Sequence, residues 1–255
     1  MKIPPDFRKR VLAREWLAGT FINLGSPVTV EIAGLAGFDW LLLDHEHGPG
    51  GEDTLLHQLQ AASATPAFTV VRIAWNDPVR FKRALDMGAM GIMVPYVNTP
   101  AEAQAAVSAM RYPPRGIRGV AKMNRGAGFG GDFDEYYKTS HERLLTVIQI
   151  ESIEAVNNAD AIAALDGVDV LFVGPADLSY NMGIPDQLDA PQFVEALKKV
   201  GDAARKHGKA AGILVQSAAL FPKLRELGYT FMALGSDGGA VRTGLIALAN
   251  ALKAK

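Results

Sequence analysis

Four ionisable side chains follow a run of leucines in the stretch LLLDHEHGPGG: Asp44, His45, Glu46 and His47. A histidine near its ordinary pKa can move a proton at neutral pH, and a pair of histidines can also bind a metal ion. The stretch therefore raises two alternatives, a metal-binding pair of histidines or a single histidine that acts as a base.

Two carboxylates and an arginine stand at the ends of other apolar runs. Glu151 closes TVIQIE, Asp177 follows GPA, and Arg72 follows TVV. Two carboxylates close together can share a hard cation such as Mg²⁺ or Mn²⁺, although either could instead cap the following helix. A buried arginine needs a counter-charge, so Arg72 either pairs with Asp44 or Asp86 or stabilises charge on a substrate oxygen.

Apolar runs of strand length recur along the chain and must position these side chains. Most are continuously apolar, which is typical of parallel strands buried on both faces. The eight runs are Thr20–Asn23, Trp40–Asp44, Phe68–Ile73, Gly91–Val97, Leu144–Glu151, Val168–Gly174, Ala210–Val215 and Phe231–Ser236.

The segments between these runs carry helix signals. Three begin with a capping residue and a proline, at Ser26, Asp77 and Thr99. Five end on a glycine suited to a left-handed helix cap, namely Gly37, Gly88, Gly167, Gly208 and Gly228. Eight strands alternating with helices in 255 residues predict an α/β fold, a (β/α)₈ TIM barrel of one domain over residues 1–255. A doubly wound open sheet is the alternative.

Three segments fall outside this regular alternation. Asp6–Leu17 has helical spacing and is expected to add an N-terminal helix that closes one end of the barrel. The glycine-rich stretch at 111–143 is long enough to be expected as an active-site loop. Its glycines do not fit a dinucleotide fingerprint, and no organic cofactor is expected. The tail Ala240–Lys255 is apolar at helical spacing and could close its own barrel.

Composition limits the class of partner. The 26 Lys and Arg residues nearly balance the 27 Asp and Glu residues, so neither a nucleic-acid footprint nor a membrane-surface charge is indicated, and a small-molecule substrate is favoured. The sequence has no cysteine, and its first residues lack an apolar signal core. We expect a cytoplasmic protein that uses neither thiolate chemistry nor a zinc–thiolate site.

The carboxyl ends of barrel strands meet at one rim, where active sites of this fold lie. Sequential strands are about 4.8 Å apart, so Glu151 and Asp177 are expected to be neighbours. A dinuclear hydrolase would need more histidine ligands at this rim than the remaining three, His57, His141 and His207, can supply. An aldolase of the Schiff-base type would need a lysine at a strand end, and no run ends in one.

The chain as a whole resembles the class II, metal-dependent pyruvate aldolases of the 2-keto-3-deoxy acid and 2,4-dihydroxyhept-2-enedioate (hydroxy ketoacid) type. The resemblance covers most of the chain and rests on specific motifs. These are DHEH at Asp44–His47, the arginine of VVRI, Pro95–Glu102, YPPRGIRG at Tyr112–Gly119, QIES at Gln149–Ser152 and GPADLS at Gly174–Ser179.

The resemblance implies a carbon–carbon lyase that reversibly cleaves a 4-hydroxy-2-ketoacid to pyruvate and an aldehyde, through a pyruvate enolate stabilised by Mg²⁺, Mn²⁺ or Co²⁺. It implies His47 as the base, Arg72 as the group that stabilises the enolate, and Asp86 as the carboxylate that raises the basicity of the histidine. Metal ligands would be Glu151 and Asp177. Substrate contacts would come from Arg72, Gln149, Gly174, Pro175, Ala176 and Asp177, with Phe21 and Leu214 as candidate pocket residues. The resemblance also implies a homohexamer in which the C-terminal helix swaps onto a neighbour.

Two other functions stay open. The first is an acyl-CoA lyase of the malyl or citryl type, for which Arg115, Arg118, Lys122 and Arg125 could bind the phosphates of CoA. The second is a non-catalytic barrel that binds a ketoacid. The identity of the aldehyde is not encoded in any motif, because an apolar pocket admits many acceptors.

Overall fold

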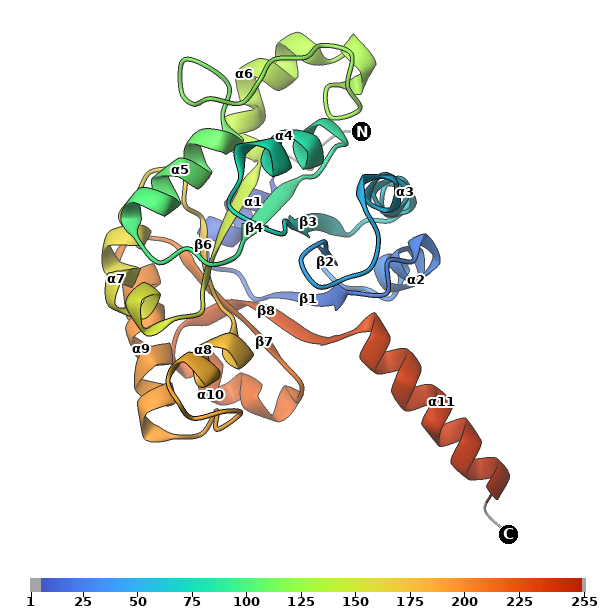
Figure 1. Cartoon of the computed structure of the whole chain (residues 1–255), viewed down its shortest axis with the longest axis vertical. Helices are drawn as coiled ribbons and strands as arrows, with labels where there is room; N and C mark the ends of the chain where they lie inside the picture. The colour runs from blue at the N-terminus through green and yellow to red at the C-terminus, as the bar shows by residue number, and fades with distance from the viewer. Residues whose placement is uncertain (1–5, 254–255) are drawn as a thin grey trace.

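The computed structural model describes residues 6–253 and contains a closed barrel of eight parallel strands in sequential order (Figure 1). Each strand pairs with its sequence neighbours, and β8 closes the barrel on β1. The TIM-barrel prediction is therefore confirmed, and the open sheet is not formed. The strands are β1 Leu17–Ile22, β2 Trp40–Asp44, β3 Phe68–Arg72, β4 Gly91–Val94, β5 Leu145–Ile150, β6 Val170–Val173, β7 Ala210–Val215 and β8 Tyr229–Ser236.

The strands agree with the predicted runs except near their ends. The fourth stops at Val94 rather than Val97, because Pro95 has no N–H to donate to a neighbouring strand. The first begins at Leu17, three residues earlier than predicted, where it pairs with Phe231 of β8.

Helices surround the barrel (Figure 1). The predicted caps form: the Asp77 side chain accepts from the Val79 N–H at 2.7 Å, and Thr99 makes a capping box with Glu102. All five predicted helix-ending glycines have positive φ. The helices are α1 Phe7–Leu12, α2 Pro27–Leu35, α3 Glu52–Ala62, α4 Pro78–Asp86, α5 Pro100–Met110, α6 Phe133–Arg143, α7 Ile153–Ala163, α8 Pro175–Asn181, α9 Pro191–Lys206, α10 Phe221–Glu226 and α11 Asp237–Lys253, with 3₁₀ turns η1 Gly128–Gly130 and η2 Ala218–Leu220. None of the helices within residues 6–253 is long and apolar enough to cross a membrane.

The interior of the barrel is filled by aromatic side chains. The ring of Trp40 stacks on Phe231 with centroids 4.0 Å apart, and Phe172 meets both rings edge-on. A Cβ atom at Gly19 would lie 2.2 Å from the Trp40 ring, so only glycine leaves room for this packing. A substrate is therefore restricted to the rim of the barrel.

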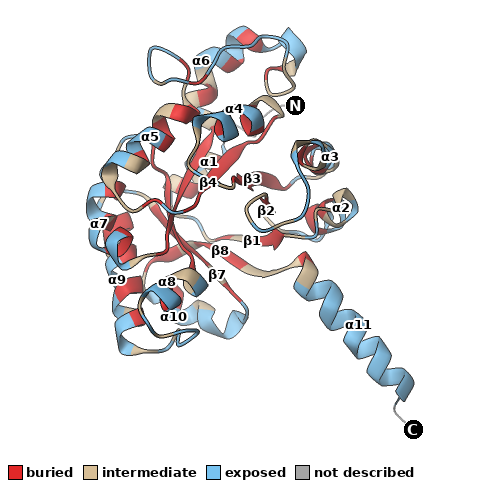
Figure 2. Ribbon diagram, viewed as in Figure 1, coloured by how far each residue is buried: buried red, intermediate tan, exposed pale blue. Residues whose placement is uncertain are grey.

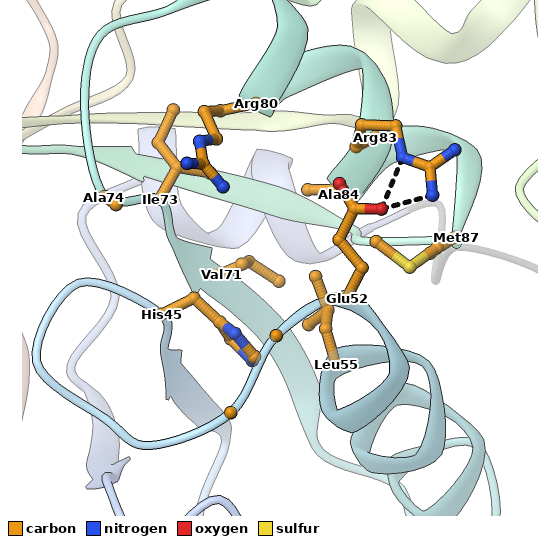
Figure 3. Close-up of a pocket in the computed structure, with 12 residues that line it drawn as sticks. His45, Glu52, Leu55, Val71, Ile73, Ala74, Arg80, Arg83, Ala84 and Met87 are labelled. Atoms are coloured by element: carbon orange, nitrogen blue, oxygen red, sulfur yellow. Dashed lines mark hydrogen bonds and ion pairs between the residues drawn. The ribbon is translucent and has the colours of Figure 1, made fainter.

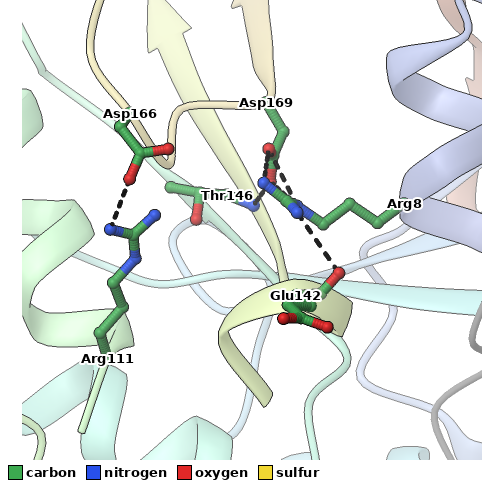
Figure 4. A network of polar contacts seen from close by, with 6 residues as sticks. All are labelled: Arg8, Arg111, Glu142, Thr146, Asp166 and Asp169. Carbon is green, nitrogen blue, oxygen red and sulfur yellow. Dashed lines mark hydrogen bonds and ion pairs between the residues drawn. The ribbon is translucent and has the colours of Figure 1, made fainter. Parts of the chain in front are cut away.

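The N-terminal helix α1 closes the amino end of the barrel, as predicted. Phe7 stacks on Phe68 at 4.0 Å, and Arg8 binds the buried carboxylate of Asp169 at 2.7 Å (Figure 4). Asp169 also accepts the Thr146 N–H at 2.9 Å. The helix is shorter than the predicted Asp6–Leu17, because Arg14 adopts a left-handed conformation with φ 57°.

The segment at 111–143 lies at the amino end of the barrel, so the expectation of an active-site loop is wrong for its own chain. It follows α5 and precedes β5, and connections from a helix to the next strand lie opposite the active-site rim. The segment contains η1 and α6 and packs around Arg118, whose guanidinium lies 4.4 Å from the Tyr112 ring centroid.

The C-terminal helix α11 extends away from the barrel and does not cover it (Figures 1 and 2). Its apolar residues Val241, Leu245, Leu248 and Leu252 are exposed, Leu252 by 90%. The alternative in which the tail closes its own barrel is therefore wrong. Ala254 and Lys255, the end of the predicted tail, and residues 1–5 of the predicted domain lie outside the described residues.

We predict that Arg8→Met lowers the free energy of unfolding by about 3 kcal/mol, because it leaves the buried Asp169 carboxylate without its counter-charge. Urea unfolding measures the change. Burial raises the pKa of Asp169, although Arg8 opposes that effect. The loss should therefore shrink as the pH falls and Asp169 becomes neutral. Lys9→Met, at an exposed position of the same helix, is the control, and an equal loss there would contradict the prediction.

Candidate active site

Asp44 and Arg72 form a buried ion pair at the carboxyl ends of β2 and β3. The two residues are register partners in the sheet, and Arg72 binds both carboxylate oxygens, through Nε at 3.0 Å and Nη2 at 2.7 Å. Burial by itself would raise the pKa of Asp44, but the hydrogen bonds and charge of Arg72 lower it below its usual value. Of the two counter-charges considered from the sequence, Asp44 is therefore the partner.

The same carboxylate also fixes the turn that follows β2. Its Oδ1 accepts the backbone N–H groups of Glu46 and His47 at 3.1 and 3.3 Å. A Cβ atom at Gly48 would lie 2.2 Å from the Asp44 carbonyl oxygen, so this tight turn requires glycine. Asp44 thus holds both the side chain of Arg72 and the backbone that carries His47.

Glu46 and His47 differ in exposure. The Oε2 atom of Glu46 lies 2.9 Å from Arg72 Nη1, so Arg72 makes a second ion pair there, although the direction is not that of a hydrogen bond. Burial raises the pKa of Glu46, and the charge of Arg72 opposes the shift. The side chain of His47 is 63% exposed, with Nε2 3.8 Å from Glu46 Oε2. Solvent therefore reaches the His47 ring.

His45 points away from this group. Its Nε2 lies 2.8 Å from Gln58 Oε1, and its ring lines a pocket between α3 and α4, outside the barrel (Figure 3). The opposite wall of that pocket carries the ion pair of Glu52 and Arg83. The two histidines of DHEH thus face different surroundings and do not form a metal-binding pair.

Glu151 lies directly after β5 and is 4% exposed. Its Oε1 accepts the backbone N–H of Tyr96 at 2.6 Å. Its Oε2 faces Gly174, where an added Cβ atom would come within 2.8 Å. Burial raises the pKa of Glu151 to about 7, against the lowering effect of the Tyr96 N–H, and the nearby carboxylates of Asp177 and Glu46 add to the rise. Glu151 does not cap α7, because Ser152 does so.

The turn after β6 lies beside Glu151. Gly174 is the N-cap of α8 and carries no side chain, while Pro175 begins the helix. Gln149 is buried, its amide nitrogen would lie 2.9 Å from a Cβ atom at Gly174, and its Oε1 has no hydrogen-bond partner within residues 6–253. Asp177 is the third residue of α8, and no hydrogen bond to its carboxylate forms within the described chain. The helix-cap alternative thus fails for Asp177 as well.

The arrangement fits a cation held by two carboxylates. No group of three or more His, Cys, Asp or Glu side chains suited to a metal ion occurs within residues 6–253. Glu151 Oε2 and the amide nitrogen of Gln149 nevertheless face the space that Gly174 leaves clear, and the charge of Asp177 acts on Glu151. Oxygen donors with open positions suit a hard divalent ion completed by water or a chelating substrate.

The sequence also predicted Phe21 and Leu214 as pocket residues and Asp86 as a catalytic residue. Phe21 lies inside the barrel, with the Arg72 guanidinium 5.4 Å from its ring centroid, and Leu214 is half-buried in β7. Asp86 is the last residue of α4, hence at the amino rim, where it binds Arg118 at 2.8 Å. Within one chain the expected partnership of Asp86 with His47 is therefore wrong.

Sequence reasoning missed Tyr96. It follows Pro95 at the end of β4 and supplies the N–H that binds Glu151. Its ring lies against Trp75, with centroids 5.4 Å apart. The position of Tyr96 at a strand end was a signal available from the sequence. The residue type itself gave no signal, because any residue other than proline has a backbone N–H.

Comparisons with known proteins show what this chain is similar to. A family model described as HpcH/HpaI aldolase/citrate lyase matches residues 17–243. A 5-keto-4-deoxy-D-glucarate aldolase from Salmonella arizonae is 42% identical over 98% of this chain and 97% of its own length. One from Klebsiella pneumoniae is 41% identical with the same coverage. The crystal structure of an HpcH/HpaI aldolase/citrate lyase family protein from Burkholderia cenocepacia superposes with a TM-score of 0.93 at 35% identity, covering 98% of this chain and 100% of that one.

The pKa of Glu151 predicts how metal affinity depends on pH. A protonated carboxyl group is a poor ligand, so Mn²⁺ affinity should rise about tenfold per pH unit below pH 7 and level off above it. Calorimetric titration between about pH 5.5 and pH 8 measures the trend. Glu151→Gln should lose both the affinity for Mn²⁺ and its dependence on pH. Glu154→Gln, at an exposed position of α7, should keep both. An affinity independent of pH across this range would refute the assignment.

Proposed function

The chain belongs to the HpcH/HpaI aldolase/citrate lyase family and is a carbon–carbon lyase; we propose that it reversibly cleaves a 4-hydroxy-2-ketoacid to pyruvate and an aldehyde, with a divalent cation on Glu151 and Asp177. The observation that carries the proposal is the buried carboxylate of Glu151, whose Oε2 faces the space beside Gly174 and which feels the charges of Asp177 and of the arginine held by Asp44. Mg²⁺, Mn²⁺ and Co²⁺ all suit such donors.

The substrate class agrees with the names of the relatives. The compound 5-keto-4-deoxy-D-glucarate, named for the two aldolases above, is a 4-hydroxy-2-ketoacid when it is numbered from its keto end. Breaking its bond between carbons 3 and 4 gives pyruvate and a hydroxyaldehyde that carries a carboxylate. It is therefore the first substrate to test.

The cleavage needs a stabilised negative charge on the keto oxygen. A bound divalent cation supplies Lewis acidity toward the carboxylate and keto oxygens of the ketoacid. Arg72 supplies a permanent positive charge, and Asp44 fixes its guanidinium through two hydrogen bonds, so little reorganisation is needed as the charge develops. The amide of Gln149 and the first backbone N–H groups of α8, from Ala176 and Asp177, would orient the ketoacid, since Pro175 has no N–H.

His47 would move the protons. In the cleavage direction a base removes the proton of the 4-hydroxyl group, the bond between carbons 3 and 4 breaks, and a proton returns to carbon 3 to form the methyl group of pyruvate. His47 is exposed to solvent and its backbone is held by Asp44, which suits a base that acts through water. Phe21 and Leu214 would line the side that receives the aldehyde.

The acyl-CoA lyase alternative has less support. The basic residues that could bind the phosphates of CoA belong to the segment at the amino rim, and Arg118 is 2% exposed. Within one chain these residues lie opposite Glu151. The ketoacid aldolase therefore stays the first proposal and the acyl-CoA lyase the second.

We also propose a homo-oligomer, which the resemblance implies to be a hexamer. The exposed apolar residues of α11 support this proposal, because a monomer gains nothing from presenting them to water.

Activity should depend on a divalent cation. We expect chelator-treated protein to release no pyruvate from 5-keto-4-deoxy-D-glucarate, and Mg²⁺, Mn²⁺ or Co²⁺ to restore release, because two carboxylates cannot polarise the ketoacid without the cation. Lactate dehydrogenase and NADH report the pyruvate. Absence of restored cleavage with every metal would refute the aldolase, and cleavage of malyl-CoA or citryl-CoA instead would favour the second proposal.

His47→Ala should lower kcat about 10²- to 10⁴-fold, the contribution usual for a general base. Steady-state cleavage assays measure it, and thermal unfolding verifies that the variant is folded. His45→Gln is the matched control, because His45 faces the pocket outside the barrel, and its rate should stay near that of the wild type. A full rate in His47→Ala would exclude His47 as the base.

A further inference from the structure

Tyr96 holds a backbone conformation that is unfavourable for its side chain. Its φ is 53°, in the left-handed region where any Cβ atom crowds the backbone and glycine does not. The residue directly follows Pro95 at the carboxyl rim of the barrel. Unfavourable backbone conformations of this kind persist where the surroundings impose them, and they gather at functional sites.

The left-handed turn brings the backbone N–H of Tyr96 to Glu151. The nitrogen of this N–H lies 2.6 Å from Oε1. The hydrogen bond thus joins the chain after β4 to the residue that follows β5. It occupies one of the two carboxylate oxygens of Glu151. The other oxygen, Oε2, faces the space beside Gly174 and accepts no hydrogen bond from residues 6–253.

We propose that Tyr96 is a positioning residue, whose left-handed turn fixes Oε1 of Glu151 through the backbone and so presents Oε2 as the oxygen that binds the divalent cation. This inference rests on the cation site proposed above. It assigns the binding role to one oxygen and the orienting role to one backbone donor. Groups that orient a metal ligand in this way normally affect metal affinity strongly.

The ring of Tyr96 stabilises the turn from outside. It contacts Trp75 with centroids 5.4 Å apart and an interplanar angle of 35°, yet the two residues are 42% and 57% exposed. Core packing therefore does not account for an aromatic residue at this position. The contact with Trp75 instead offsets part of the cost of the left-handed backbone.

Two substitutions at this position separate the backbone from the side chain. Tyr96→Ala removes the contact with Trp75 and retains the steric penalty, so the turn should relax and Mn²⁺ should bind about tenfold more weakly. Tyr96→Gly removes the same contact, but glycine adopts a positive φ without penalty, and its affinity should stay within about threefold of the wild type. Calorimetric titration with Mn²⁺ measures both affinities.

Arg14→Ala is the control for truncating a side chain at a strained position, because Arg14 also has a positive φ, of 57°, but lies at the amino end. It should lower thermal stability and leave Mn²⁺ affinity unchanged. Equal affinities in Tyr96→Ala and Tyr96→Gly, whether both weakened or both unchanged, would overturn the role of the turn, as would a tenfold loss in Arg14→Ala. Wild-type protein that binds no Mn²⁺, or binds it as tightly after Glu151→Gln, would overturn the cation site itself and this inference with it.

Discussion

The buried pair of Asp44 and Arg72 is the interaction on which the rest of the site depends. A guanidinium at the end of a parallel strand is tolerated only with a carboxylate beside it, and the register of β2 against β3 supplies that carboxylate. The same carboxylate holds the turn that carries His47. One charged pair therefore fixes both the cationic group and the proposed base, while the second half of the site comes from β5 and α8 across the rim.

The two ends of the barrel differ in the charged groups that they carry. At the amino end, charged groups are paired inside the protein: Arg8 with Asp169, and Arg118 with Asp86. At the carboxyl end, Glu46 and Gln149 each keep a buried oxygen without a hydrogen bond. Arg118 Nε and the Tyr112 hydroxyl at the amino end are also buried without a hydrogen bond in the described chain. The carboxyl end is distinguished instead by the carboxylates of Glu46, Glu151 and Asp177, whose charges act on one another.

Much of this could be predicted from residue types. Continuous apolar runs and helix-ending glycines at regular spacing predict the barrel, and they place Glu151 and Asp177 after neighbouring strands of one rim. The choice of partner for Arg72 could not be predicted, because it depends on strand register rather than on spacing. The expectation for 111–143 rested on the length of the segment and that for Asp86 on similarity of motif, and neither says at which end of the barrel a residue of the same chain lies. Tyr96 was missed because its contribution comes from its backbone.

The exposed helix α11 would couple folding to association in the oligomer proposed above. Its leucines contact water in a single chain. Only contact with another molecule would bury them and add the stabilisation that comes from burying apolar surface. In the proposed oligomer, folding and association become linked equilibria, and the fraction of intact barrel then depends on how many copies share the solution. For such an oligomer, a free energy of unfolding would have meaning only at a stated protein concentration.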